Sequence, residues 1–196
     1  MDYSLFKALN GMSGRVQVLD ATVAFLAIEL SVLFVVLVAL LFLLPWGCAR
    51  RDRRRAAVSA TAAAAFGLFV NQPIAAAVGR FRPYVTHPYT HLLIARSQDP
   101  SFPSDHATGA FAMAMSVWLY DRRFGAVLFV LAAVLAVSRV YVGTHYPSDV
   151  AGGALIGLAV ALMLHIGLAK RALEGLSDRL SALWDQMAGF ASSVGR

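Results

Sequence analysis

Charged residues and cysteine are both scarce in this sequence. Only 14% of its 196 residues are charged and 59% are hydrophobic, whereas soluble globular domains have about 25% charged and about 45–50% apolar residues. Too few polar side chains remain to cover a core in water, so a soluble domain is excluded and the lipid bilayer is the expected solvent. The single cysteine, Cys48, excludes an internal disulfide and a cysteine-rich metal site.

Long apolar runs take the place of the missing charge. Residues 21–44 form a run of about 24 residues, which as a helix is about 36 Å long and exceeds the ~30 Å hydrocarbon thickness of a bilayer. Further apolar runs, each bounded by charged or turn-forming residues, lie at 56–79, 105–120, 124–142 and 148–168. We therefore predict an all-α membrane protein: a helical bundle of about five transmembrane helices over residues 20–168, within a single domain covering residues 1–196.

Residues 1–18 and 170–196 flank this core and are predicted to form amphipathic surface helices. The C-terminal segment spaces its apolar residues three and four apart, as one face of a helix requires. These residues are Leu173, Leu176, Leu180, Leu183, Met187 and Phe190. A position on the inner membrane surface is favoured for this helix, and pairing with a second copy, which would give a homodimer, is the alternative.

The basic residues follow the membrane topology rather than forming a surface for nucleic acid. The chain has 17 Lys and Arg against 11 Asp and Glu, and nine of the basic residues cluster between apolar runs, at 50–55, 122–123 and 170–171. Because cytoplasmic loops are rich in Lys and Arg, these clusters predict the cytoplasmic side. Other basic residues, Arg82 and Arg139 among them, then lie outside, against this rule, which indicates that some of them bind an anion.

Two polar loops interrupt the apolar pattern. Arg80, Arg82 and Ser104 lie between the second and third runs, and Arg139 and His145 lie between the fourth and fifth. An even number of spans separates the two loops, so both lie on the same side of the membrane. Each loop ends in a Pro-Ser-Asp sequence that predicts a helix start, whose free N–H groups suit a phosphate. Arginine forks bind phosphate oxygens, so the loops together predict an anion site.

Histidine and carboxylate side chains add chemistry to this site. His145 and Asp149 are four residues apart, so a helix that starts near His145 would place them on one face and let the carboxylate hold one ring nitrogen. The other nitrogen is then a nucleophile or base, and His106, at the start of a different helix, can donate a proton to a departing oxygen. These groups and the arginines suffice for phosphoryl transfer without a metal.

In combination these residues resemble the three-part signature of the type 2 phosphatidic acid phosphatase superfamily. The parts are Arg82-Pro83, then Pro103-Ser104-Asp105-His106, then Ser138-Arg139 followed by His145 and Asp149 at the family's spacing. Two positions depart from the pattern: Ala75 stands where the family usually has a lysine, for which Arg80 is a candidate replacement, and Asp105 stands where glycine is usual. The Pro-Ser-Asp-His sequence and the small core resemble the bacterial undecaprenyl-diphosphate phosphatases of the bacitracin-resistance type.

The resemblance implies a phosphatase that works through a phosphohistidine. His145 would attack the phosphorus, Asp149 would orient His145, and His106 would protonate the leaving group. The phosphate oxygens would be held by Arg82, Ser104 and Arg139, with Arg80 as a further candidate. No metal and no other cofactor is expected.

The implied substrate is an isoprenoid or glycerolipid phosphate among the membrane lipids, with no nucleic acid partner. Undecaprenyl diphosphate is favoured, hydrolysed to undecaprenyl phosphate and phosphate in recycling of the cell-wall carrier lipid. A phosphatase for phosphatidylglycerophosphate or phosphatidic acid is the enzymatic alternative, and a lipid-phosphate carrier is the non-enzymatic one. The implied location is the bacterial plasma membrane, with several spans and the active site on the outer side.

One ionisable residue, Glu29, lies inside the first apolar run, where a charge is costly. We predict that Glu29 faces the bundle interior near the lipid headgroup, or that it has a polar partner such as Asn71 or Gln72.

Overall fold

The apolar runs fold into helices that lie side by side. The structure, a computed structural model, describes the backbone of residues 1–44 and 50–194 and the side chains of residues 1–44 and 50–188, so Cys48 and the Phe190 side chain lie outside the described parts. The helices of the described backbone are α1 (Asp2–Asn10), α2 (Gln17–Leu43), α3 (Arg50–Val78), α4 (Pro83–Thr86), α5 (Asp105–Trp118), α6 (Arg122–Tyr141), α7 (Pro147–Leu164) and α8 (Gly167–Val194).

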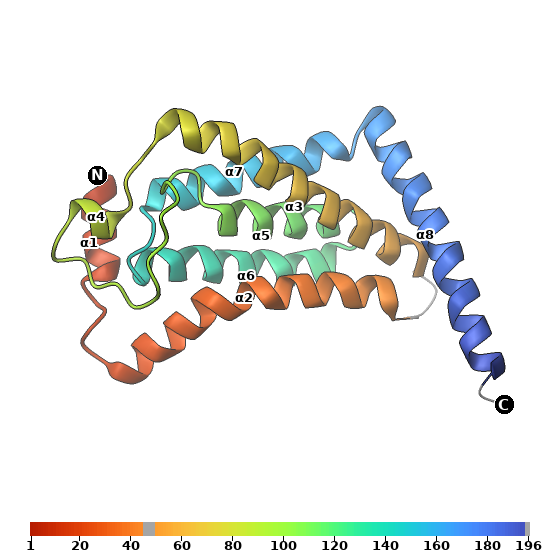
Figure 1. Cartoon of the computed structure of the whole chain (residues 1–196), viewed down its shortest axis with the longest axis horizontal. Coiled ribbons are helices and arrows are strands. Elements are labelled where there is room, and N and C mark those ends of the chain that lie inside the picture. The colour runs from red at the N-terminus through yellow and green to blue at the C-terminus, as the bar shows by residue number, and fades with distance from the viewer. Residues whose placement is uncertain (45–49, 195–196) are drawn as a thin grey trace.

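The long helices run antiparallel and give the bundle two distinct ends (Figure 1). At one end, which we call the site end, lie α1, α4 and the first turns of α5 and α7. At the opposite end, which we call the α8 end, α8 crosses the bundle close to the start of α3. The two polar loops both reach the site end, as the count of spans between them predicts.

The all-α class is confirmed, whereas the count of five spans is not. By length and composition the described residues contain four candidate spans: Gln17–Leu43, Arg50–Thr86, Arg122–Tyr141 and Pro147–Leu164. The remaining predicted span is α5, which has 14 residues and is about 21 Å long. It lies in the centre of the bundle against α3, α6 and α7 (Figure 1). Because α5 is surrounded by protein, it does not need the length that the bilayer requires.

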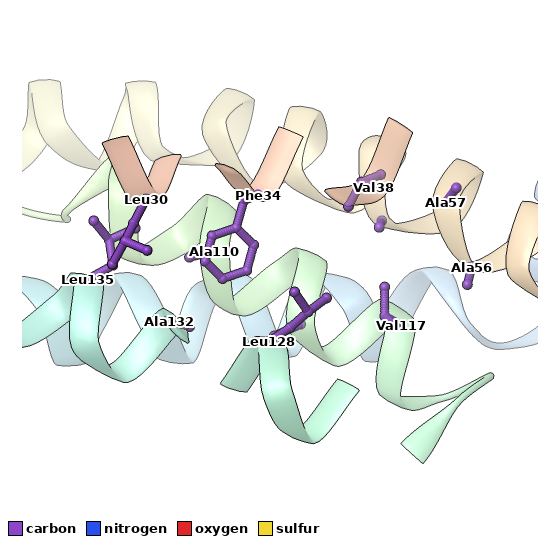
Figure 2. Close-up of a cluster of buried hydrophobic side chains, with 12 residues drawn as sticks. Leu30, Phe34, Val38, Ala56, Ala57, Ala110, Val117, Leu128, Ala132 and Leu135 are labelled. Atoms are coloured by element: carbon purple, nitrogen blue, oxygen red, sulfur yellow. The ribbon is translucent and has the colours of Figure 1, made fainter. Parts of the chain in front are cut away.

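The main core joins α2, α3, α5 and α6 (Figure 2). Its large side chains, Phe34, Leu128 and Leu135, come from α2 and α6, while α3 and α5 contribute mainly alanines. Small residues let helix backbones approach closely, which is the principal source of helix association where lipid is as apolar as leucine. The alanine-rich sequence of α3 therefore serves packing as well as membrane insertion.

Glycines in α7 allow its backbone to approach α5 closely. A Cβ atom at Gly153 would lie 2.5 Å from the Ser104 carbonyl oxygen, and one at Gly157 would lie 2.4 Å from the Thr108 carbonyl oxygen. The Ser104 N–H also donates to the Asp149 carbonyl, at 3.1 Å. These contacts hold the first turns of α5 and α7 together at the site end.

Of the two predicted surface helices, only the N-terminal one differs from expectation. The predicted surface helix over residues 1–18 is shorter, because α1 ends at Asn10. There the Asn10 amide donates to the carbonyls of His91 and Tyr141, and the following turn contains Gly14 at φ +81°. At the other end, α8 covers the segment predicted as an amphipathic helix.

Both expectations for Glu29 are wrong. Its side chain is exposed on α2 and does not face the bundle interior. The Asn71 amide instead donates to Asp105 and Thr108, at 2.6 and 2.9 Å, and the Gln72 amide donates to the Leu68 carbonyl.

Candidate active site

The His145 side chain is almost fully buried at the site end. His145 lies in the turn between α6 and α7, and its side chain is 2% exposed. Its Nδ1 atom is 2.8 Å from the Ser101 carbonyl oxygen, which can only accept a hydrogen bond. Nδ1 therefore carries the proton, and Nε2 holds the lone pair. Arg82 Nη1 lies 3.3 Å from Nε2. The Ser101 carbonyl thus leaves the Nε2 lone pair directed away from the backbone and toward Arg82.

The link between His145 and Asp149 is less direct than the four-residue spacing predicts. Helix α7 begins at Pro147, so His145 precedes it and the two residues do not share a helix face. The distance from Nδ1 to the nearer Asp149 oxygen is 3.8 Å, which is an ion-pair distance and too long for a hydrogen bond. Burial lowers the pKa of His145, Asp149 opposes this shift, and the positive charges of Arg82 and Arg139 reinforce it.

Asp149 is fully buried and organises the surrounding loops. Its carboxylate accepts from the Ser101 hydroxyl at 2.5 Å, from the Tyr146 N–H at 2.8 Å and from Arg80 Nη1 at 2.7 Å. Ser101 therefore bridges the pair: its hydroxyl donates to Asp149 while its carbonyl holds the His145 ring. The sequence offers no sign of this role, because a backbone carbonyl carries no residue signature.

Arg82 and Arg139 are buried cations that lack a carboxylate partner among the described residues. Arg82 donates to the carbonyls of Asp99 and Thr144, at 2.8 and 3.2 Å, and Arg139 donates to the Ala27 carbonyl at 3.3 Å. The buried Arg139 Nε has no hydrogen-bond partner. Among the described side chains, no carboxylate pairs with either guanidinium. Two such charges beside His145 make a site for an anionic ligand.

Ser104 adds a neutral donor to the same site. It occupies the N-cap position of α5, yet its side chain makes no capping hydrogen bond. Its hydroxyl is buried and lacks a hydrogen-bond partner. A pure capping role is therefore excluded, and the hydroxyl is available to a phosphate oxygen at the start of the helix.

Asp105 and His106 form the first turn of α5, next to Ser104. The Asp105 carboxylate accepts from the buried Asn71 of α3, which sequence reasoning considered as a partner for Glu29. The His106 ring is half-buried, and its burial, together with the charges of Arg139, His145 and Arg82, lowers the pKa of His106 to about 3 in the free site. The structure therefore brings both predicted catalytic histidines to the same cluster of arginines.

Among the predicted phosphate ligands, Arg80 differs because its guanidinium is already paired with carboxylates of the protein. Its guanidinium donates to Asp149 and Asp2, at 2.7 and 2.6 Å, and to the Ser148 hydroxyl at 2.6 Å. It also lies over the Tyr146 ring, 4.0 Å from its centroid. Sequence reasoning missed Asp2 and Tyr146 in this cluster, because neither belongs to the motif.

An apolar groove leads away from the site toward the α8 end. Its volume is about 920 Å³, and its walls are formed by α2 and α3 with α5 between them. Asp105 and His106 line it at the site end, and Leu176 and Leu180 of α8 line it at the other. From Ser31 to Leu43 along α2 it extends for about 18 Å. His106 thus stands where an apolar surface begins.

Comparison with known proteins places this arrangement in a family. The model of the PAP2 superfamily matches residues 56–172, which include both histidines and Asp149. The undecaprenyl-diphosphatase BcrC of Bacillus subtilis (strain 168) is 32% identical over 163 residues, covering 83% of this chain and 82% of that protein.

Two solved structures share the fold. LpxE of Aquifex aeolicus superposes with a TM-score of 0.64 at 24% identity, over 83% of this chain and 93% of that one. The first transmembrane PAP2-type phosphatidylglycerolphosphate phosphatase from Bacillus subtilis gives a TM-score of 0.60 at 18% identity, over 90% of this chain and 86% of that one. Since the family model covers more than half of the sequence and all of the histidine site, the chain belongs to the PAP2 superfamily.

Proposed function

We propose that this protein hydrolyses undecaprenyl diphosphate to undecaprenyl phosphate and phosphate at the His145 site. The proposal rests on the unprotonated Nε2 atom of His145. Its Nδ1–H is held by the Ser101 carbonyl, and Arg82 and Arg139, which have no carboxylate partner among the described residues, lie beside it. The similarity to BcrC of Bacillus subtilis, an undecaprenyl-diphosphatase, supports the choice of substrate.

The reaction proceeds in two displacements. When the substrate phosphate binds beside His106, its negative charge offsets the nearby arginines and raises the His106 pKa, so that His106 carries a proton. His145 Nε2 then attacks the terminal phosphorus, the N–P bond forms, and the P–O bond to the lipid phosphate breaks as His106 gives that oxygen its proton. His106, now neutral, takes a proton from water; the resulting hydroxide attacks phosphorus, and the N–P bond breaks to release phosphate.

The oxygens of the transferring phosphoryl group bind Arg82, Arg139 and Ser104. The incoming anion takes over the Arg82 N–H that lies 3.3 Å from Nε2, which frees the lone pair for attack. Both arginines then face the charge that develops in the transition state, in a buried site where such interactions are strong. Asp149 balances the imidazolium character that His145 gains.

The groove supports a lipid leaving group. Because His106 protonates the departing oxygen, the chain attached to that oxygen starts beside His106, and the apolar groove starts at the same residue. The chain therefore follows α2 and α3 while the phosphate stays among the arginines.

The decisive assay is phosphate release by purified protein in detergent with EDTA present, offering undecaprenyl diphosphate and phosphatidic acid separately. We expect rapid release from the diphosphate, and loss of at least about 10⁴-fold in His145→Ala. Preference for phosphatidic acid would retain the mechanism and change the substrate. Activity in purified His145→Ala would refute the nucleophile, and a folded protein inactive on both lipids would instead indicate a lipid-phosphate carrier.

We also propose that the site end faces the outside of a bacterial plasma membrane. The basic clusters at 50–55 and 122–123 belong to the α8 end, which supports a cytoplasmic position for that end. In a Cys48→Ser background, a membrane-impermeant maleimide should label Tyr89→Cys, which is exposed in the site-end loop, in intact cells. It should label Arg122→Cys, at the α8 end, only after lysis. The reverse pattern would invert the proposed topology.

A further inference from the structure

Arg80 bridges two carboxylates that are far apart in the sequence. Its Nη1 donates to Asp149 and its Nη2 donates to Asp2, at 2.7 and 2.6 Å. Asp2 is the first residue of α1, and its carboxylate also accepts from the N–H and the hydroxyl of Ser148, at 3.0 and 2.6 Å. The first turn of α1 is thus joined to the first turn of α7, beside the catalytic carboxylate.

The contact between Asp2 and Arg80 joins two charged groups. Partial burial would raise the pKa of Asp2, but hydrogen bonds from Ser148 and Arg80 lower it below its ordinary value. Asp2 is therefore ionised at neutral pH, and so is Arg80. Charge-assisted hydrogen bonds of this kind are short and about twice as strong as neutral ones.

The orientation of Arg80 separates it from the other arginines of the site. Both of its terminal nitrogens donate to protein oxygens, and its planar face rests on Tyr146. Arg82 and Arg139, by contrast, have carbonyl partners and no carboxylate partner among the described residues. Because its terminal nitrogens and its planar face are both engaged by the protein, the Arg80 guanidinium is not directed at a phosphate.

Helix α1 is itself fixed against the same elements. Phe6 is buried against Val140 of α6 and Tyr146, and Tyr3 stacks on His87 with ring centroids 3.9 Å apart. Asp2 therefore approaches Arg80 from a docked helix. Removal of its charge alone need not displace α1.

We propose that Asp2 and Arg80 are positioning residues that act on His145 through Asp149. Arg80 partly compensates the buried Asp149 charge and fixes the position of its carboxylate, which holds the Ser101 hydroxyl. The Ser101 carbonyl in turn fixes His145 Nδ1–H. Asp2 keeps Arg80 on Asp149 and away from the substrate phosphate. This inference rests on the proposed function, since it assigns parts to the same phosphohistidine reaction.

The inference predicts how kcat and KM respond to substitution. Arg80→Gln should lower kcat by about a hundredfold, as misplacement of reacting groups does, with KM nearly unchanged. Asp2→Asn should lower kcat by about tenfold without raising KM. Lys7→Gln, an exposed charge change on the same helix, is the matched control and should retain wild-type kinetics. A large rise in KM of Arg80→Gln with kcat preserved would show instead that Arg80 binds phosphate.

A double variant tests whether the two residues act together. If Asp2 acts only by holding Arg80, then Asp2→Asn combined with Arg80→Gln should lose no more kcat than Arg80→Gln alone. Multiplication of the two losses would overturn the coupling. Thermal unfolding of each variant in detergent identifies any loss that comes from a destabilised α1, because such a loss accompanies a lower Tm.

The pH dependence supplies a readout that a purely structural role would not move. The charged or titratable groups that face His145 are Asp149, Arg82, Arg139 and His106. Loss of the Arg80 charge leaves Asp149 uncompensated and so favours imidazolium, which raises the pKa of His145. The acid limb of the kcat/KM profile should therefore move to higher pH in Arg80→Gln.

The titration of the His145 ring by NMR tests the same shift without turnover. An unchanged His145 pKa in a folded Arg80→Gln protein would refute the inference, even if the wild type released no phosphate. A wild type without phosphatase activity would count against the proposed function alone, so the two failures are distinguishable.

Discussion

Arginines gather at both ends of this bundle, and the two groups differ in what neutralises them. At the α8 end, Arg51 and Arg55 pair with Asp178, at 2.7 and 2.9 Å, and Arg54 pairs with Asp185 at 2.9 Å. At the site end, Arg82 and Arg139 donate to backbone carbonyls and have no carboxylate partner among the described residues. The arginines at the α8 end are neutralised by carboxylates of the protein, whereas Arg82 and Arg139 at the site end can be neutralised by an anionic ligand.

The difference shows that arginine content alone does not identify an anion site. Paired arginines at the α8 end fasten α8 to α3, largely at the surface, where each ion pair contributes little to stability. Uncompensated arginines at the site end are buried, which costs free energy in the absence of an anion. A protein keeps such costly groups where their interaction with substrate or transition state is strong. Burial and the missing carboxylate together therefore mark the site.

The sharpest way to break this comparison is to remove one arginine from each end. Arg139→Gln should reduce kcat/KM for undecaprenyl diphosphate by between about 10² and about 10³, as loss of a donor to a developing oxyanion does. Arg51→Gln removes an equal charge from a surface pair and should change kcat/KM by less than about twofold. Steady-state phosphate release measures both. Equal losses in the two variants would show that total charge matters rather than the site geometry.

Much of the site end could be predicted from the sequence, because motif residues and loop topology leave their marks there. The motif spacing selected His106, His145, Asp149 and Arg82, and the parity of spans predicted that both loops share one face. The supporting contacts could not be predicted in the same way. The Ser101 carbonyl is backbone, and Asp2 meets Ser148 across 146 positions of sequence.

The errors have the same origin in tertiary context. A span count from apolar length assumes that each helix meets lipid, and α5 meets other helices instead. A shared helix face was expected for His145 and Asp149, but α7 starts after His145, and the two side chains approach to 3.8 Å without a direct hydrogen bond. In each case the packing of neighbouring elements decided the geometry. Local sequence patterns do not encode that packing.

The groove connects the two ends and offers a test of intermediate size. Leu180→Trp would fill its far end, where α8 packs against α3. We expect kcat/KM for undecaprenyl diphosphate to fall by about tenfold, the scale on which a hydrophobic pocket discriminates, while the short-chain farnesyl diphosphate keeps its rate. Leu183→Trp, exposed on the same helix and outside the groove lining, is the control. Equal losses with both substrates would show that the chain does not extend to α8.

The smallest effect on activity is expected from the ion pairs of the α8 end. Hydrogen bonds from Arg51 and Arg55 lower the pKa of Asp178. The stabilisation of α8 docking by the Asp178 charge is therefore complete above the ordinary carboxyl pKa and is lost progressively as the pH falls below about 4. Asp178→Asn should accelerate amide hydrogen exchange in α8 at neutral pH, while kcat at the distant site stays within about twofold of wild type.

The exposed Asp52 provides the matched control, because it makes none of these ion pairs. Asp52→Asn should therefore leave exchange in α8 unchanged. On acidification, exchange in wild-type α8 should approach that of Asp178→Asn, since protonation removes the same charge. A loss of kcat in Asp178→Asn comparable to that in Arg139→Gln would mean that the paired arginines also serve catalysis, and that the contrast between the two ends is false.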